Sequence, residues 1–191
     1  ALELRALGID ANCAPVADIA GPDTHPFLRN RCHGTTVAQV CSIARAVADA
    51  HLAQGVLPVV KHLPGHGRAT ADSHLHLPRV TAPAEDLKAQ DFAPFAALAD
   101  LPMAMTAHIV FTAFDDRPAT QSPVMIDVIR RQIGFQGLLL TDDLNMEALS
   151  GDLGQRTAAA MAAGCDIALH CKGDMPGMQA VAAHAGDLRP D

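Results

Sequence analysis

The sequence VLPVVKHLPGHGRATADSHLHLP, which runs from Val56 to Pro78, carries the main information on both fold and chemistry. It begins with an apolar, β-branched run that is typical of a buried strand, and polar residues follow where that strand ends. The glycines and prolines after the run predict an irregular loop. In repeating βα proteins the carboxyl ends of the strands carry the chemistry, so this junction is predicted to form part of a functional site.

The rest of the chain repeats this alternation of strand and helix. Apolar runs predict strands near 14–18, 56–61, 103–109, 138–141 and 167–171. Helical spacing predicts helices over 36–54, 85–99, 123–133, the alanine-rich segment that ends at Gly164, and about 175–184. A run of βα units predicts an α/β fold with a parallel sheet or barrel. The pattern fits either an open five-stranded sheet or the larger part of a (β/α)8 TIM-type barrel.

Capping residues predict several helix ends. Thr35 or Thr36 can cap the helix over 36–54, and Gly55 follows its end. Ser122 can cap the helix over 123–133, and Gly134 follows it. The residues expected on the buried face of the helix over 85–99 are Leu87, Phe92, Phe95 and Leu98.

The composition limits the class of protein. The 191 residues are 49% hydrophobic and 18% charged, which is typical of one globular domain. The net charge of −7 argues against a nucleic-acid partner. We find no apolar run that could span a bilayer and no signal-peptide pattern at the start. The five cysteines are odd in number and lack CxxC spacing, so we expect free thiols in a cytoplasmic protein.

Asp72-Ser73-His74 places a carboxylate two residues before an imidazole. A loop can fold so that Asp72 accepts a hydrogen bond from one ring nitrogen of His74. This contact would fix the tautomer and leave the other nitrogen for general acid/base chemistry. In the alternative interpretation, Asp72 and Ser73 only satisfy backbone donors of the loop.

Asp142 directly follows the apolar run 138–141 and therefore emerges at the carboxyl end of a predicted strand. A carboxylate at this position is suited to act as a nucleophile or as a metal ligand. It could instead cap the helix that follows, although Asp143 could take that role and leave Asp142 free.

Basic side chains occur near the same strand ends. Lys61 ends a strand too apolar for an ordinary surface charge, so we expect a carboxylate or polar ligand as its partner. His62 lies beside it. Arg31, in a polar loop after Asp18, could reach the same site or remain a solvated loop residue. His108 fits either a site-lining or a core histidine.

The number of histidines raises the possibility of a catalytic zinc site, for which three histidine or carboxylate ligands suffice. The candidate ligands are His62, His66, Asp72, His74 and His76. Because His74-Leu75-His76 is the only HxH pair and no later ligand follows at a familiar spacing, we expect a site without a metal.

Three separated motifs resemble the signature of glycoside hydrolase family 3, with the closest likeness to its bacterial cytoplasmic β-N-acetylglucosaminidases of peptidoglycan recycling. They are Lys61–Gly67 with Asp72-Ser73-His74 and Leu77-Pro78, then Thr141–Met146, and the upstream segment Ala14–Asp18. The resemblance runs over essentially the whole chain. It implies that residues 1–191 are part of a catalytic (β/α)8 barrel domain whose first strands precede residue 1.

The resemblance also implies the roles of individual residues. Asp142 matches the catalytic nucleophile, His74 the general acid/base, and Asp72 the carboxylate that pairs with this histidine. The substrate-binding residues that it implies are Arg31, Lys61 and His62. The implied reaction is a retaining double displacement through a glycosyl-enzyme, with no metal and no organic cofactor.

The implied substrate is a non-reducing terminal β-linked N-acetylglucosamine on anhydro-muramyl sugars or peptides derived from peptidoglycan. We expect a cytoplasmic monomer with no nucleic-acid or membrane partner. The alternatives are a related β-glucosidase or glycoside phosphorylase, a metal-dependent hydrolase built on the histidines, and a non-catalytic fragment.

Overall fold

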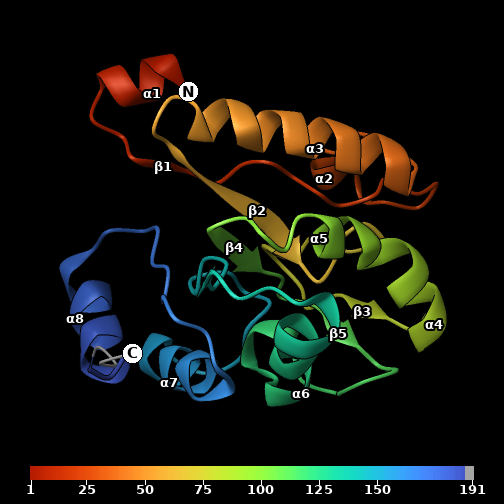
Figure 1. Ribbon diagram of the computed structural model, residues 1–191. Helices are drawn as coiled ribbons and strands as arrows, with labels where there is room; N and C mark the ends of the chain where they lie inside the picture. Colours follow the sequence, from red (N-terminus) through yellow and green to blue (C-terminus); the bar gives the residue numbers. More distant parts are fainter. Residues whose placement is uncertain (188–191) are drawn as a thin grey trace.

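The structure, a computed structural model, describes residues 1–187 and shows an α/β fold around a parallel sheet (Figure 1). The sheet has four strands in the order β1–β2–β4–β6, with bounds Ala11–Asn12, Leu57–Leu63, Met103–Thr106 and Leu138–Leu140. All three pairings are parallel. The strand order follows the chain without the reversal that marks a doubly wound sheet, and progressive order is that of a (β/α)8 barrel.

Short elements surround this sheet. Strands β3 (Arg79–Val80) and β5 (Val110–Phe111) form a separate parallel pair. The α-helices are α1 (Leu2–Ala6), α2 (Pro26–Arg29), α3 (Val37–Leu52), α4 (Ala84–Asp86), α5 (Ala93–Ala97), α6 (Pro123–Asp127), α7 (Leu153–Ala163) and α8 (Met175–His184). The π-helical turns η1 (Leu87–Asp91) and η3 (Val128–Ile133) and the 3₁₀ turn η2 (Ala119–Gln121) complete the set.

The predicted helix ends are confirmed where a local signal marks them. The Thr36 side chain accepts a hydrogen bond from the backbone of Gln39 at the start of α3. Ser122 caps α6 in the same way, and Gly134 ends η3 with a left-handed φ of 87°. Each of these contacts lies within a few residues of the chain, which explains why the sequence predicts it.

The continuous helix predicted over 85–99 is wrong, because the chain forms α4, η1 and α5 in succession. Pro94 lacks the backbone N–H that a continuous helix would need. Before it, the N–H of Phe92 bonds to the carbonyl of Leu87, five residues back, and this closes a π turn. The buried face was predicted correctly, since Leu87, Phe92, Phe95 and Leu98 all lie in the core.

Two predicted strands are reduced to single bridges. Near 14–18, only Val16 bridges to Lys61, because Pro15 has no N–H to donate to a ladder. Near 167–171, only Ile167 bridges to Leu140. The next donor, the N–H of Leu169, bonds to the hydroxyl of Thr141 instead of a carbonyl. The strand predicted over 103–109 ends early, because β4 stops at Thr106; β5 begins only at Val110, outside the predicted range.

The sheet buries different residues on its two faces, because side chains alternate along a strand. Val60, Ala104 and Leu139 belong to the main core, on the side where α3 packs against β2. The alternate positions form a second, smaller cluster of Val59, Met103, Met105 and Leu140. One face against helices and the other filled by its own side chains is the arrangement of a barrel wall.

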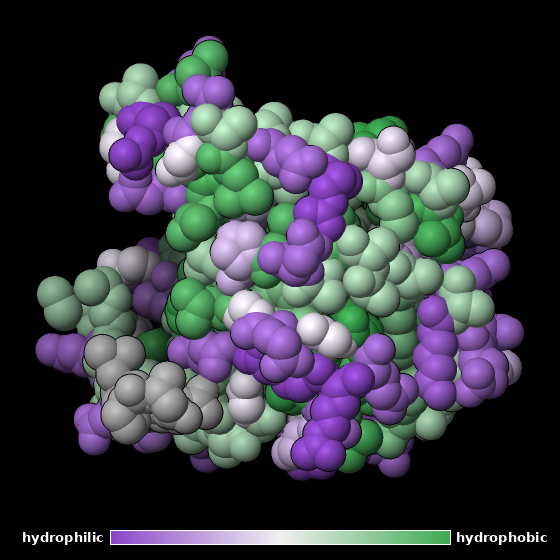
Figure 2. Space-filling view, in the orientation of Figure 1, coloured by the Kyte–Doolittle hydropathy of each residue, from purple (hydrophilic) through white to green (hydrophobic). Residues whose placement is uncertain are grey.

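The sheet does not close on itself within residues 1–187, where β1 and β6 are its outer strands. Figure 2 shows the surface hollowed on the left, between the region of α1 above and that of α8 below. None of the helices in the described residues is long and apolar enough to cross a membrane.

Gly67, at the start of the loop after β2, passes directly against the backbone of Ile19. A Cβ at Gly67 would lie 1.9 Å from the carbonyl oxygen of Ile19, whereas one at Gly21 would meet nothing closer than 3.6 Å. We expect Gly67→Ala to lower the free energy of unfolding by about 1–3 kcal/mol or more. Gly21→Ala is the matched control and should change it little. Urea unfolding of both variants checks this, and equal stability would contradict the close approach.

Candidate active site

The buried carboxylate of Asp18 organises the carboxyl end of β2. It accepts the ring Nδ1–H of His62 at 2.7 Å, the backbone N–H of His62 at 3.3 Å, and the backbone N–H of His66 at 2.6 Å. Burial alone raises the pKa of Asp18, but the charge and hydrogen bond of His62, with the contribution of His66, outweigh it and lower the pKa. Asp18 therefore remains ionised, and because it occupies Nδ1 of His62, Nε2 is left without a hydrogen-bond partner among residues 1–187.

His74 and Asp72 form the pair that their spacing allows and that the family resemblance implies. The ring Nδ1–H of His74 donates to Oδ1 of Asp72 at 2.7 Å, and the backbone N–H of His74 donates to the same oxygen at 2.9 Å. Partial burial raises the pKa of Asp72, but these two hydrogen bonds outweigh it and lower the pKa. Nδ1 thus carries a proton, and Nε2 of the half-exposed His74 ring is the nitrogen available for proton transfer.

Asp142 lies half-buried in the turn after β6. Its Oδ1 accepts the backbone N–H of Asp143 at 2.8 Å, and its other oxygen has no hydrogen-bond partner in the described residues. Burial raises the pKa of Asp142, but attraction to His62 and then to His108, followed by the hydrogen bond from Asp143, lowers it overall. The result is an ionised carboxylate with one free oxygen, as a nucleophile requires.

Asp143 stabilises this turn. Its Oδ1 accepts from the backbone and side-chain amides of Asn145 and from the backbone of Cys171. Its carbonyl accepts from Nε2–H of His108 at 3.1 Å, and burial lowers the pKa of His108, so this ring is neutral. His108, for which the sequence left both a site-lining and a core role open, is therefore a core histidine, and its ring stabilises the turn through the carbonyl of Asp143. The alternative in which Asp143 caps a following helix is wrong, because the next helix, α7, begins at Leu153 and is capped by Asp152.

A cavity of about 310 Å³ brings most of the predicted residues together. From the predicted set it is lined by Arg31, Lys61, His62, His74 and Asp142. Asp72 does not line the cavity but accepts a hydrogen bond from Nδ1 of His74. Lys61 forms no ion pair within residues 1–187. Its charge makes the smallest of the contributions that lower the pKa of Asp142, after those of His62, His108 and the Asp143 backbone. Arg31 lies over the ring of Phe27, with 5.2 Å between the guanidinium carbon and the ring centroid.

Phe27 was missed in the sequence, and it lines the cavity together with Met146 as its apolar surface. His66, considered only as a metal ligand, and Ser73, considered only as a residue that satisfies loop donors, line the cavity from the β2 side. Asp18 was noticed only as part of a motif. A signal for it did exist, since a carboxylate after the apolar positions Val16 and Ala17 is unusual unless buried donors require it.

The histidines proposed as zinc ligands do not converge. Nδ1 of His62 bonds to Asp18, Nε2 of His66 lies 2.9 Å from Oγ of Ser73, and His74 pairs with Asp72. His76 is exposed. In the part of the chain that the structure describes, no group of three or more histidine, cysteine, aspartate or glutamate side chains could hold a metal ion.

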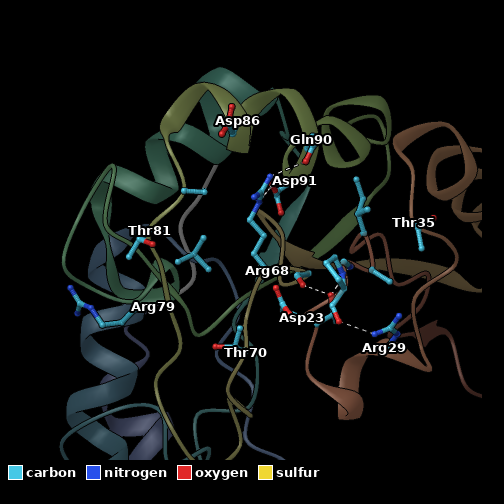
Figure 3. A pocket seen from close by; sticks show the side chains of 18 of the residues that line it. Asp23, Arg29, Thr35, Arg68, Thr70, Arg79, Thr81, Asp86, Gln90 and Asp91 are labelled. Atoms are coloured by element: carbon cyan, nitrogen blue, oxygen red, sulfur yellow. Dashed lines mark hydrogen bonds and ion pairs between the residues drawn. The ribbon is translucent and has the colours of Figure 1, made fainter.

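A larger cavity of about 850 Å³ contains none of the predicted residues. Figure 3 shows two of its arginines directed at partners within the protein. Arg68 bonds to Asp91 at 2.6 Å and to Gln90 at 2.8 Å, and Arg29 bonds to the carbonyl of Pro22 at 3.0 Å. No histidine is among the described residues that line this cavity, whereas the smaller cavity holds His74 and Asp142 together, so we place the candidate active site in the smaller cavity.

The sequence matches a family model along nearly all of its length. The model described as the glycosyl hydrolase family 3 N-terminal domain matches residues 1–189. Beta-hexosaminidases from Methylococcus capsulatus and Alkalilimnicola ehrlichii are 39% and 38% identical, over 90% and 100% of this chain. The chain covers 52% and 56% of these two relatives, so it spans about half the length of the curated relatives that it matches.

Solved structures share the fold. A glycoside hydrolase family 3 β-N-acetylglucosaminidase from Paenibacillus sp. has a TM-score of 0.89 at 33% identity, covering 96% of this chain and 36% of that one. NagZ from Neisseria gonorrhoeae, in complex with N-trifluoroacetyl-D-glucosamine, has a TM-score of 0.84 at 34% identity, covering 95% and 53%. With the progressive strand order, this similarity confirms the predicted barrel-type fold.

The pKa shift of Asp18 predicts a pH dependence of stability. Because the folded-state pKa lies below the ordinary 3.8, the ionised carboxylate stabilises the fold above that value, and the contribution is lost as the pH falls through the folded pKa. Asp18→Asn should lower the free energy of unfolding by about 3 kcal/mol at pH 7, and the difference from the unsubstituted protein should shrink toward pH 3.

The matched control is Asp23→Asn, an exposed aspartate in the following loop. It should leave the curve of unfolding free energy against pH nearly unchanged. If Asp18→Asn ran parallel to the unsubstituted protein at every pH, the charge of Asp18 would not be what stabilises this part of the fold.

Proposed function

The chain belongs to glycoside hydrolase family 3, and from this premise we propose that it carries the catalytic site of a retaining β-N-acetylglucosaminidase. The observation that supports this most is the meeting of two groups at one cavity of about 310 Å³. His74, with Nδ1 bonded to Asp72, and the ionised Asp142, with one oxygen free, both line it. A nucleophile and a proton donor at one small cavity are the two groups that glycoside hydrolysis needs.

In the first step Asp142 is the nucleophile. A carboxylate oxygen attacks the anomeric carbon and forms an ester bond, while the bond from that carbon to the glycosidic oxygen breaks. The leaving oxygen takes a proton from Nε2 of His74, and Asp72 stabilises the imidazolium that supplies it. The fixed Nδ1–H therefore directs the transferable proton to the cavity side of the ring.

In the second step the glycosyl-enzyme is hydrolysed. Nε2 of His74, now neutral, takes a proton from water, the water oxygen bonds to the anomeric carbon, and the ester bond to Asp142 breaks. A second carboxylate as acid/base would place two negative charges near each other when Asp142 is free. An imidazole avoids this repulsion, which is a physical reason for pairing an aspartate with a histidine.

Three further polar side chains that line the cavity can offer donors to a sugar. His62 offers Nε2, because Nδ1 is occupied by Asp18, and Lys61 offers an ammonium group beside it. Arg31 offers its guanidinium at the same cavity. We propose these three residues as the groups that bind the hydroxyls and the 2-acetamido group. A cavity of this volume lies at the small end of ligand pockets, which favours one terminal sugar unit.

The substrate class extends the proposal. The beta-hexosaminidases among the relatives, and the NagZ complex with a glucosamine derivative, favour N-acetylglucosamine at the non-reducing end. The motif resemblance favours a peptidoglycan-derived anhydro-muramyl sugar or peptide as the rest of the substrate.

We further propose that residues 1–191 are one partial barrel domain of a monomeric cytoplasmic enzyme. The net charge of −7 argues against a nucleic-acid partner, and we expect the cysteines to be reduced.

Covalent trapping tests the nucleophile. Incubation with a slow substrate that carries fluorine on the N-acetylglucosaminyl ring should add the mass of one fluorinated N-acetylglucosaminyl group to the intact protein. Peptide mapping should then locate the group on Asp142 and not on the neighbouring Asp143. Asp142→Asn should take up no label and should lose at least about 10³-fold in kcat. A folded protein that turns over substrate without a label on Asp142 would contradict this role.

Substitution of the two histidines in one loop tests the acid/base. His74→Ala should lower kcat/KM by about 10²–10⁴-fold and remove one limb of its pH profile, since general acid/base catalysis contributes about that much. His76→Ala is the matched control, because His76 is exposed two residues along the same loop. A pH profile unchanged in His74→Ala would rule His74 out as the proton donor.

A further inference from the structure

The 69–78 loop, which carries Asp72 and His74, has an unusual pattern of burial. Leu75 is 54% exposed although its side chain is apolar, whereas the polar Ser73 is only 2% exposed. The reverse is expected from hydrophobicity alone, so a specific polar contact must hold Ser73 inward. That contact is with His66, whose Nε2 lies 2.9 Å from Oγ of Ser73.

His66 is itself fixed to the body of the protein. Its backbone N–H donates to Asp18 at 2.6 Å, and its ring is 1% exposed. The ring also packs edge-on against His62 and Phe27, each with 5.5 Å between centroids. His66 therefore presents Nε2 to the loop from a rigid position at the end of β2.

Few hydrogen bonds hold the middle of the loop. Between Thr70 and Leu77 the described contacts with the rest of the molecule are the His66–Ser73 hydrogen bond and one backbone bond from Glu147 to the carbonyl of His74, at 3.0 Å. The other hydrogen bonds here, including those from His74 to Asp72, stay within the loop. Phe27 adds an edge contact to His74, with 5.3 Å between ring centroids.

Ser73 lies between the two members of the proton-transfer pair. Its inward side chain fixes the backbone on which Asp72 and His74 are carried, so the direction of the His74 ring depends on where Ser73 is held. We propose that His66, acting through its hydrogen bond to Ser73, is the residue that positions His74 for proton transfer. This inference rests on the proposed function, and it makes His66 and Ser73 positioning residues that do not touch the reacting atoms.

The environment of His66 suits this role. Burial, followed by repulsion from His62, lowers the pKa of His66 to about 4, so its ring stays neutral throughout the neutral range. The His66–Ser73 hydrogen bond then does not change as the pH passes through the range where an ordinary histidine titrates. A loop held in this way keeps its place while His74 gains and loses its proton.

Two substrates that differ only in the leaving group test the proposal. An N-acetylglucosaminide with a phenyl leaving group needs the proton donor for departure, whereas one with a 2,4-dinitrophenyl group does not. Ser73→Ala should lower kcat/KM for the phenyl substrate about 10–100-fold, a part of the acid/base contribution, and for the dinitrophenyl substrate less than about 3-fold. An equal loss on both substrates, or no loss on either, would overturn the proposal.

Substitutions at His66 provide the rescue. His66→Leu should reproduce the effect of Ser73→Ala, and the double variant should lose little more than either single one. His66→Gln can place an amide nitrogen near the position of Nε2 and should recover most of the phenyl activity. Recovery no better than in His66→Leu would count against the hydrogen bond. The control in the loop is Leu75→Ala, which should change neither substrate.

Amide hydrogen exchange tests the positioning role of His66 without relying on the proposed activity. Exchange in the peptide over 69–78 should be faster in Ser73→Ala and in His66→Leu than in the unsubstituted protein or in Leu75→Ala. Unchanged exchange would overturn the positioning role even if activity fell. An unsubstituted protein that cleaves neither substrate would contradict the proposed function, whereas the exchange result would still report whether His66 holds the loop.

Discussion

A buried carboxylate that lacks partners would cost several kcal/mol, so the surroundings of Asp18 must supply donors. They do so from the end of β2, where His62 and His66 provide a ring N–H and two backbone N–H groups. This constraint fixes the path of the chain at the strand end. It also fixes which nitrogen of His62 is left for the cavity, and it places the ring of His66 against the loop that carries His74. The positions of His62 and His66 in the site therefore depend on one buried charge, that of Asp18.

Sequence patterns predicted the parts of the fold that depend on neighbours in the chain. The caps at Thr36 and Ser122 are contacts over three residues, and the apolar face with Phe92 and Phe95 follows from helical spacing. The predicted strands were wrong where a tertiary contact takes the backbone donor that a strand ladder would need. The N–H of Leu169 goes to a side-chain oxygen, which no periodicity reveals. The interruption at Pro94 could have been predicted, because proline removes a helical donor wherever it stands.

The candidate site divides in the same way. For residues close in the sequence, such as Asp72 and His74, the spacing left two interpretations open, and the structure shows both: Asp72 accepts from the ring and from the backbone N–H of His74. The contacts of Asp18 were missed, because its partners His62 and His66 lie 44 and 48 residues away. Phe27 was missed for a different reason. A single phenylalanine in a polar segment carries no pattern, and only the packing of its ring against His66 and His74 makes it part of the cavity.

The pair proposed for proton transfer, Asp72 and His74, lies on a different loop from Asp142, after β2 and after β6 respectively. Within residues 1–187 the hydrogen bond between these two loops runs from the backbone of Glu147 to that of His74. A backbone contact does not depend on which side chain stands at either position. In evolution, the two loops can therefore accumulate substitutions independently, as long as Ser73 keeps its buried hydroxyl. A descendant of this protein could exchange its leaving-group preference by changing the first loop, without disturbing the carboxylate on which the sugar would be held.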